Sequence, residues 1–167
     1  MENYRLGVGI IMLNKQKKVF AGKRIDTKTD GWQMPQGGID TGESLHDALW
    51  RELFEETGCT RDLADIIYET KDWYSYKLPS YLKKSLWGGK YEGQKQKWFL
   101  LNFKGQDSDI NILPNSELNK EGPIQAEFSE WNWLDYKILP TFIVDFKRQV
   151  YIDLINEVGP IIDLLEI

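Results

Sequence analysis

One segment, Gly37 to Cys59, constrains the fold of this 167-residue chain more than any other. Its apolar residues recur at intervals of three and four, which is the spacing of an amphipathic α-helix. These residues are Leu45, Ala48, Leu49 and Leu53. The segment therefore predicts a helix with one face directed at a core.

Both ends of this helix have sequence signals. Pro35 and the glycines at 37–38 predict a turn before it. The residues at 40–42 (Asp, Thr and Gly) are candidates for its N-cap. Gly58 is typical of the residue that ends a helix, because glycine readily adopts the left-handed conformation there. The helix is thus expected to lie between these signals.

Three carboxylates occupy the last turns of the helix. Glu52, Glu55 and Glu56 stand at i, i+3 and i+4, which are neighbouring positions on a helix surface. At about 100° per residue, Glu52 and Glu56 continue the apolar face, and Glu55 lies beside it. The acids therefore point toward the body of the protein, where unpaired charges would be costly.

A positive partner is needed between these acids, and two are plausible. Arg51 can pair with Glu55 at i, i+4, which would make the segment an ordinary surface helix with a salt bridge. Alternatively, clustered carboxylates select hard divalent cations such as Mg²⁺ or Mn²⁺. An isolated helix of this kind favours the first interpretation, and the surrounding pattern favours the second.

That pattern resembles the Nudix box, in which Gly, five residues, Glu and seven residues precede Arg-Glu-aliphatic-x-Glu-Glu-x-Gly-aliphatic. The matching positions are Gly37, Glu43, Arg51, Glu52, Leu53, Glu55, Glu56 and Gly58. The one departure is Cys59 at the final aliphatic position, where cysteine packs as a small hydrophobe. The resemblance implies an α/β (α+β) Nudix fold, a mixed β-sheet sandwiched between helices.

The rest of the chain fits such a fold as a single domain over residues 1–167. Residues 5–13 are nearly all apolar and predict a central strand, with a turn at 14–18. A helix is expected from Pro140 onward, broken at Gly159-Pro160. Further strands are expected at 19–23, 66–76, 97–103 and 127–134. Loops are expected at 26–31 and at 80–94, and irregular structure at 104–123.

Composition limits the function classes. The net charge is −5, but residues 71–97 hold seven lysines, so a local basic patch can attract an anionic substrate. The alternative is a solvated lysine-rich loop. The single cysteine excludes an intrachain disulfide framework. His46 is the only histidine and is read as a surface residue. No targeting or membrane-spanning pattern is found, and we expect a cytoplasmic protein.

The segments around the box narrow the family. They resemble the bacterial RNA pyrophosphohydrolases, which are also described as dinucleoside polyphosphate hydrolases, from about Tyr4 to Val158. The segments that carry this resemblance are GWQMPQGGI, WYSYKLP, EGQKQKWFLL, EFSEWNWL and VDFKRQVY. The resemblance implies a metal-dependent enzyme that uses Mg²⁺ or Mn²⁺.

The resemblance also implies roles for single residues. It places a metal site at the Gly37 carbonyl, Glu52, Glu55, Glu56 and Glu127, with these four acids and Arg51 as the catalytic residues. Glu56 and Glu127 are both candidates for the general base. Without the resemblance, Glu127 would be read as a surface acid at the edge of a loop.

The residues that the resemblance assigns to the substrate are Arg5, Arg24, Tyr76, Phe146 and Lys147. Arginine binds phosphate through two parallel N–H bonds, and aromatic rings stack on bases at about 1–3 kcal/mol each. The ordinary alternatives are an exposed end-of-strand charge for Arg24 and core packing for Tyr76 and Phe146. The loop between Arg24 and Trp32 (IDTKTDG) differs locally from the family in spacing and composition, which is expected to alter the contacts to the first nucleotide.

The expected reaction converts 5′-triphosphate or 5′-diphosphate RNA to 5′-monophosphate RNA, which starts mRNA decay. The alternative substrate is a dinucleoside polyphosphate such as diadenosine tetraphosphate. A pyrophosphatase of free nucleotides shares the box but not the flanking segments. An inactive RNA-binding module would have lost box acids, and all four are present. We expect a monomer with neither DNA nor a membrane as partner.

Overall fold

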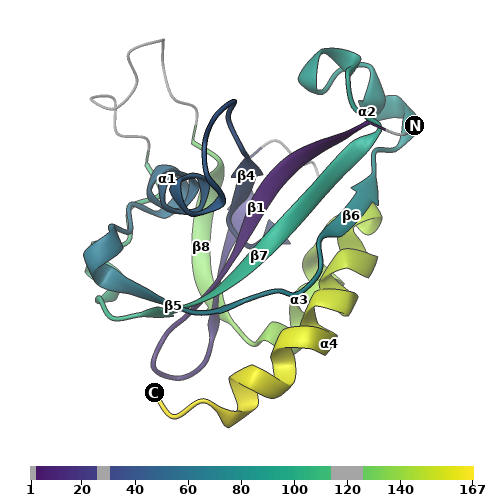
Figure 1. Cartoon of the computed structure of the whole chain (residues 1–167). Helices are drawn as coiled ribbons and strands as arrows, with labels where there is room; N and C mark the ends of the chain where they lie inside the picture. The colour runs from purple at the N-terminus through teal and green to yellow at the C-terminus, as the bar shows by residue number, and fades with distance from the viewer. Residues whose placement is uncertain (1–2, 26–30, 114–125) are drawn as a thin grey trace.

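The computed structural model describes residues 3–25, 31–113 and 126–167. These residues form one eight-stranded mixed sheet. A long helix lies on each face of the sheet (Figure 1). The sandwich of helices and sheet expected from the sequence is confirmed. The expected loop at 26–31 and irregular segment at 104–123 lie partly outside the described residues.

The sheet is built around a parallel pair of strands. β1 (Tyr4–Leu13) pairs with β7 (Gly93–Phe103) along its whole length, within the strand order β3-β2-β1-β7-β5. β4 pairs with β1, β6 with β7 and β8 with β2. The other strands are β2 (Val19–Arg24), β3 (Trp32–Gln33), β4 (Gln36–Gly38), β5 (Ala64–Glu69), β6 (Tyr74–Lys77) and β8 (Phe128–Leu134).

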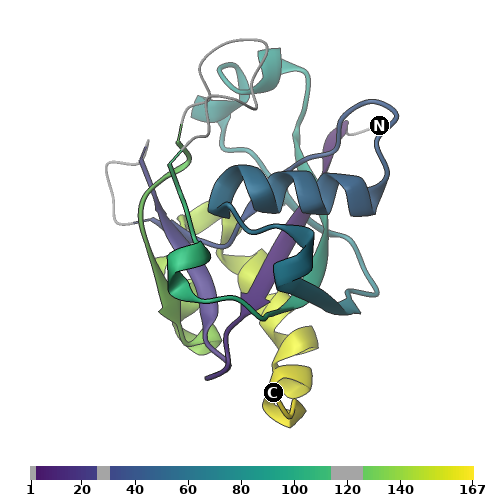
Figure 2. The ribbon, with the colours of Figure 1, turned by 90° about the vertical axis from the view of Figure 1, so that its left-hand side faces the viewer.

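Two long helices cover the two faces of this sheet. α1 (Leu45–Thr57) lies on one face and α4 (Arg148–Leu164) on the other, which the quarter turn between Figures 1 and 2 makes plain. α2 (Ser80–Lys83) and α3 (Leu139–Phe142) are single turns. Short 3₁₀ segments lie at Arg61–Leu63, Trp87–Gly89, Asp107–Asp109, Tyr136–Ile138 and Asp145–Lys147. None of the described helices has the length and apolar content that crossing a bilayer requires.

The central strand supplies side chains to both cores, because successive residues of a strand point to opposite faces. Val8, Ile10 and Met12 pack in the cluster that includes Leu49 and Leu53 of α1. Ile11 and Leu13 pack in the cluster on the α4 side, with Tyr151, Leu154 and Val158. The nearly continuous apolar run of residues 5–13 therefore does mark a strand that is buried on both faces.

The box helix ends as predicted but begins later. Gly58 closes α1 with φ of 73°, and its N–H donates to the carbonyl of Phe54. The predicted caps at 40–42 are wrong, because Ser44 is the N-cap and its hydroxyl accepts a bond from Asp47 N–H. Cys59 is 1% exposed within the core, as its hydrophobic character suggests.

Two strand predictions need correction. The predicted strand at 66–76 is two strands, β5 and β6, which pair with different parts of β7. The turn between them holds Thr70, whose hydroxyl accepts a bond from Trp98 N–H and so replaces a ladder contact. β7 also begins at Gly93, four residues before the predicted start, and the predicted loop at 80–94 contains α2.

The C-terminal helix also differs from the prediction. The chain turns twice after Pro140, and α4 begins only at Arg148. The predicted break at Gly159-Pro160 is wrong, because α4 continues to Leu164 with Pro160 on its exposed side. Contacts beyond the proline stabilise this last turn: Ile162 is 1% exposed, and Asp163 accepts a hydrogen bond from Tyr136 Oη at 2.8 Å.

Glu157 of α4 connects this helix to the turn between β5 and β6 through hydrogen bonds. Its carboxylate accepts hydrogen bonds from Tyr68 Oη, Tyr74 Oη and Lys71 N–H. We expect Glu157→Ala to destabilise the protein by about 2 kcal/mol, because three donors lose a charged acceptor. Urea unfolding would measure this. Glu166→Ala, an exposed site after α4, should stay within about 0.5 kcal/mol, and equal effects for the two variants would contradict the expectation.

Candidate active site

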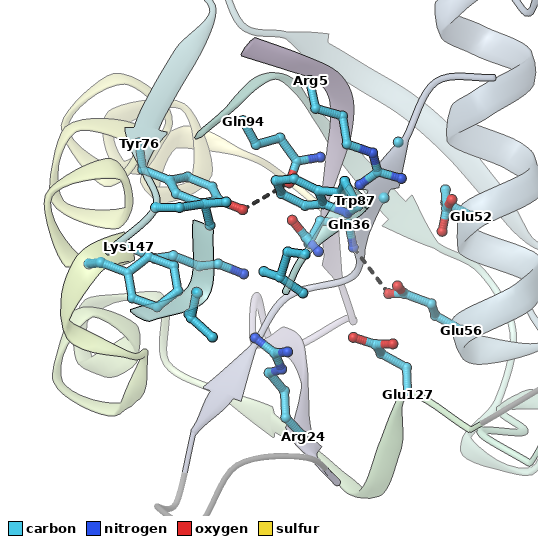
Figure 3. A pocket seen from close by; sticks show the side chains of 16 residues that line it. Arg5, Arg24, Gln36, Glu52, Glu56, Tyr76, Trp87, Gln94, Glu127 and Lys147 are labelled. Atoms are coloured by element: carbon cyan, nitrogen blue, oxygen red, sulfur yellow. Dashed lines mark hydrogen bonds between the residues drawn. The ribbon is translucent and has the colours of Figure 1, made fainter. Parts of the chain in front are cut away.

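A cavity of about 380 Å³ lies where β1, β4, β6 and β7 meet the last turns of α1. Figure 3 shows that acidic side chains line one side and that Tyr76 and Lys147 line the opposite side. Arg5 and Arg24 lie between these two sides in the same view. The cavity thus combines carboxylates and cations that come from distant parts of the chain.

Most of the residues that the sequence singled out meet in this cavity. The nine that line it are Arg5, Arg24, Gly37, Glu52, Glu56, Tyr76, Glu127, Phe146 and Lys147. Arg51 and Glu55 do not line it. Whether each residue acts on metal or substrate stays a prediction, but their placement in one cavity makes a common function possible.

Glu56 is the most buried acid of the cavity. It is 8% exposed, and its Oε2 accepts a hydrogen bond of 3.1 Å from Gln36 N–H. Burial raises the pKa of Glu56 well above its usual value, and the nearby charges of Glu52 and Glu127 raise it further. The Gln36 N–H and the Lys147 ammonium offset only part of this increase.

Arg51 lies outside the cavity lining and binds the neighbouring acids through its guanidinium group. Its Nε and Nη2 donate to the two carboxylate oxygens of Glu43 at 2.8 and 2.9 Å. Nη1 donates to Glu52 at 2.8 Å and to Glu55 at 3.3 Å, and Nη2 also reaches the carbonyl of Gly38. The predicted pair between Arg51 and Glu55 is therefore present, as one contact of a larger network.

The two glycines that open the box are pressed against charged side chains. A Cβ on Gly37 would lie 2.0 Å from Cδ of Glu52, and a Cβ on Gly38 would lie 2.1 Å from Nη2 of Arg5. A Cβ at either position would displace the charged end of that side chain. Glycine at both positions therefore lets Glu52 and Arg5 keep the places that they occupy in the cavity.

The acids suit a hard cation by their chemistry, since carboxylate oxygens are the ligands that such ions prefer. Glu52, Glu56 and Glu127 line one cavity, and burial raises the pKa of Glu52 to about 7 despite the nearby Arg51. In the part of the chain that the structure describes, no three acidic, histidine or cysteine side chains stand close enough to share one ion. Arg51 forms ion pairs with both Glu52 and Glu55. The side chain of Glu55 is 40% exposed.

The opposite side of the cavity is aromatic. Tyr76 is only 7% exposed: its hydroxyl donates to Gln94 Oε1 at 2.8 Å, and its ring centroid lies 5.6 Å from that of Phe146. The ammonium of Lys147 lies 5.3 Å from the Tyr76 ring centroid and donates to Gln33 Oε1 at 3.3 Å. The area that Tyr76 can offer to a base is therefore small.

Sequence reasoning missed several residues of the cavity. Gln36, Gly38, Gln94 and Trp87 line it, as do the leucines at 78, 82 and 86. None of the seven lysines at 71–97 does, so the predicted basic patch does not form its wall. The GQKQKW and WGG segments hold Gln94 and Trp87, but only the fold brings these residues to the acids.

A Nudix-type sandwich whose cavity is lined by box acids defines a hydrolase that acts on pyrophosphate bonds. The NUDIX domain family profile matches residues 3–154, and the chain belongs to this family. Two relatives are named RNA pyrophosphohydrolase. That of Novosphingobium aromaticivorans is 51% identical over 92% of this chain and 91% of its own, and that of Sphingopyxis alaskensis is 45% identical over 95% of both.

Solved structures show the same fold at low sequence identity. The Escherichia coli dihydroneopterin triphosphate pyrophosphohydrolase aligns with a TM-score of 0.65 at 17% identity, over 92% of this chain and 97% of its own. A Caenorhabditis elegans Ap4A hydrolase complex aligns with a TM-score of 0.63 at 16% identity, over 93% and 98%. These likenesses support the fold alone.

Proposed function

We propose that this protein is an RNA pyrophosphohydrolase. It removes pyrophosphate, or single phosphates, from the 5′ end of triphosphorylated or diphosphorylated RNA and leaves a 5′-monophosphate that starts decay. The observation that carries the proposal is the cavity itself, where three glutamates, one of them buried, face Arg5, Arg24 and Lys147. Relatives that share about half of its residues and bear the name RNA pyrophosphohydrolase support it.

Nudix hydrolases generally use divalent cations, and we propose Mg²⁺ or Mn²⁺ here. Glu52, Glu56 and Glu127 would hold them from the cavity, with the Gly37 carbonyl and Glu55 as further ligands. The bound cation would supply charge neutralisation and a more acidic water. The Arg51 network would then set where Glu52 and Glu55 stand.

The residues of the chain supply the remaining chemistry. Water attacks a phosphorus of the 5′ polyphosphate, and the bond from that phosphorus to a bridging oxygen breaks. The proton of the water passes to Glu56 or Glu127, whose carboxylates line the same cavity. Arg5, Arg24 and Lys147 stabilise the negative charge that the phosphates carry, Arg5 and Arg24 through paired N–H groups.

A comparison of substrates tests this function. With Mg²⁺, we expect kcat/KM to be at least about tenfold higher for 5′-triphosphate RNA than for diadenosine tetraphosphate, because relatives that share about half of the residues of this chain bear the name RNA pyrophosphohydrolase. 5′-Diphosphate RNA is the third substrate, and Glu56→Gln is the inactive control. A higher kcat/KM for the dinucleotide would instead make the protein a dinucleoside polyphosphate hydrolase.

A further inference from the structure

Trp87 is a cavity residue that neither the box nor the family resemblance pointed to. It lies in the 3₁₀ segment between α2 and β7, and it is half-buried at the cavity wall. Figure 3 places its indole ring beside the guanidinium of Arg5. The guanidinium carbon lies 4.8 Å from the ring centroid, which is the distance of a cation–π contact.

Arg5 is also pressed against the backbone of the box. A Cβ on Gly38 would lie 2.1 Å from Nη2, 2.4 Å from Cζ and 2.8 Å from Nε of Arg5. Three guanidinium atoms therefore contact the surface of one glycine. The guanidinium therefore contacts both the Trp87 ring and the Gly38 backbone, which limit its movement.

The donors of this restrained guanidinium are not engaged by the residues that the structure describes. Among the described residues, Arg5 makes no hydrogen bond or ion pair through its side chain. It lines the cavity together with Glu52, which stands against the adjacent Gly37. A planar cation with available N–H groups is suited to bind a phosphate through two parallel bonds.

The position of Trp87 is itself fixed by local structure. Its φ is 51°, and Gly88 and Gly89 follow at 66° and 72°, so a bulky residue adopts the left-handed region that usually favours glycine. Such strain persists only where the surroundings determine it. The Tyr91 ring lies at 6.1 Å in an edge-on arrangement, and Asn3 bonds to Lys90 and Glu92.

We propose that Trp87 is a positioning residue that holds the guanidinium of Arg5 against Gly38, so that its N–H groups face the polyphosphate. This inference rests on the proposed function, because it assigns a polyphosphate to the cavity. A flexible arginine would have to be ordered when the substrate binds, whereas a restrained arginine is already in place. Removal of the ring should therefore weaken phosphate binding through Arg5.

Binding of methylenediphosphonate in the presence of Mg²⁺ tests this inference by calorimetry. This probe has no base and no hydrolysable bond. We expect Trp87→Ala to bind it about fivefold to tenfold more weakly, and Trp87→Phe to recover most of the affinity. In an Arg5→Ala background, the same Trp87 substitution should have almost no further effect, because the residue it positions is absent.

Trp50→Ala is the matched control. Trp50 lies under another arginine, Arg61, at 5.7 Å, but this pair stands outside the cavity. Its removal should leave probe affinity unchanged. Thermal unfolding of each variant identifies misfolded protein, and the Phe variant keeps the test valid if Trp87→Ala does not fold.

Two outcomes would overturn the inference. Equal weakening by Trp87→Ala with and without Arg5 would show that the two residues act independently. An unchanged probe affinity with a raised KM for RNA would show instead that Trp87 stacks on a base. If wild-type protein releases no pyrophosphate from RNA while the probe shows the coupling, the proposed function fails and the positioning role stands.

Discussion

Glu56→Gln is expected to lower kcat for 5′-triphosphate RNA by about 10³-fold, which is the size of effect expected for an acid–base residue at a reacting centre. Glu56 is the most buried acid of the cavity, and Gln36 N–H fixes one of its oxygens. Glutamine keeps the shape and the acceptor for that bond but removes the charge. A quenched-flow or steady-state assay of pyrophosphate release would measure the loss.

The same substitution should stabilise the protein in the absence of metal. Glu56 lies near Glu52 and Glu127, and the three charges repel one another in a site that is largely shielded from water. Removal of one charge should raise the free energy of unfolding by about 1 kcal/mol at pH 8. Activity and stability would thus change in opposite directions, which a misfolded variant could not produce.

Glu130→Gln is the control for both measurements. Glu130 lies on β8 three residues after Glu127, but it is exposed and pairs with Lys23 outside the cavity. We expect wild-type activity and stability within about 0.5 kcal/mol for this variant. Full activity of Glu56→Gln would remove Glu56 from the active site and, with it, the proposed metal site.

The local part of the site was predictable because the box is a continuous helix. Helical periodicity placed Glu52 and Glu56 on the inward face and Glu55 beside it, and the structure agrees. The residue at which the helix starts was not predictable from periodicity. The residues at 40–42 and Ser44 all precede the helix and include good capping side chains, and only the backbone conformation decides between them.

The non-local part could not be predicted from periodicity. Glu127 reaches the cavity because β8 pairs with β2, and without a family resemblance it looks like any acid at the edge of a loop. Trp87 lies near Arg5 because β1 and β7 run parallel from Tyr4 and Gly93. Pairing of strands about 90 residues apart or more depends on the whole fold, which no local pattern encodes.

Arg51→Ala is expected to produce a large loss of stability. The side chain is 28% exposed and donates to Glu43, Glu52 and Glu55. Its removal leaves Glu43 and Glu52, which are 15% and 12% exposed, without their cation. We expect a loss of about 3 kcal/mol, at the lower end for a broken buried ion pair because Arg51 is partly solvated.

Activity should fall with stability in this variant, by about 10²-fold, since Glu52 and Glu55 would no longer be held in position. Arg51→Lys is the matched comparison. It keeps the charge but cannot make the paired bonds to Glu43 and reach the Gly38 carbonyl at once, so it should recover about half of the lost stability. Denaturant unfolding at pH 7.5 would measure both variants.

The stability difference should also depend on pH. The hydrogen bond from Arg51 holds the pKa of Glu43 below its ordinary value of 4.5. A lowered pKa in the folded state contributes stability above about pH 4.5, and this contribution is lost as pH falls toward the lowered value. The gap between wild type and Arg51→Ala should thus be wide at pH 7 and narrower at pH 4. A gap that is equal at both pH values would exclude the charge of Glu43 as a source of this stability.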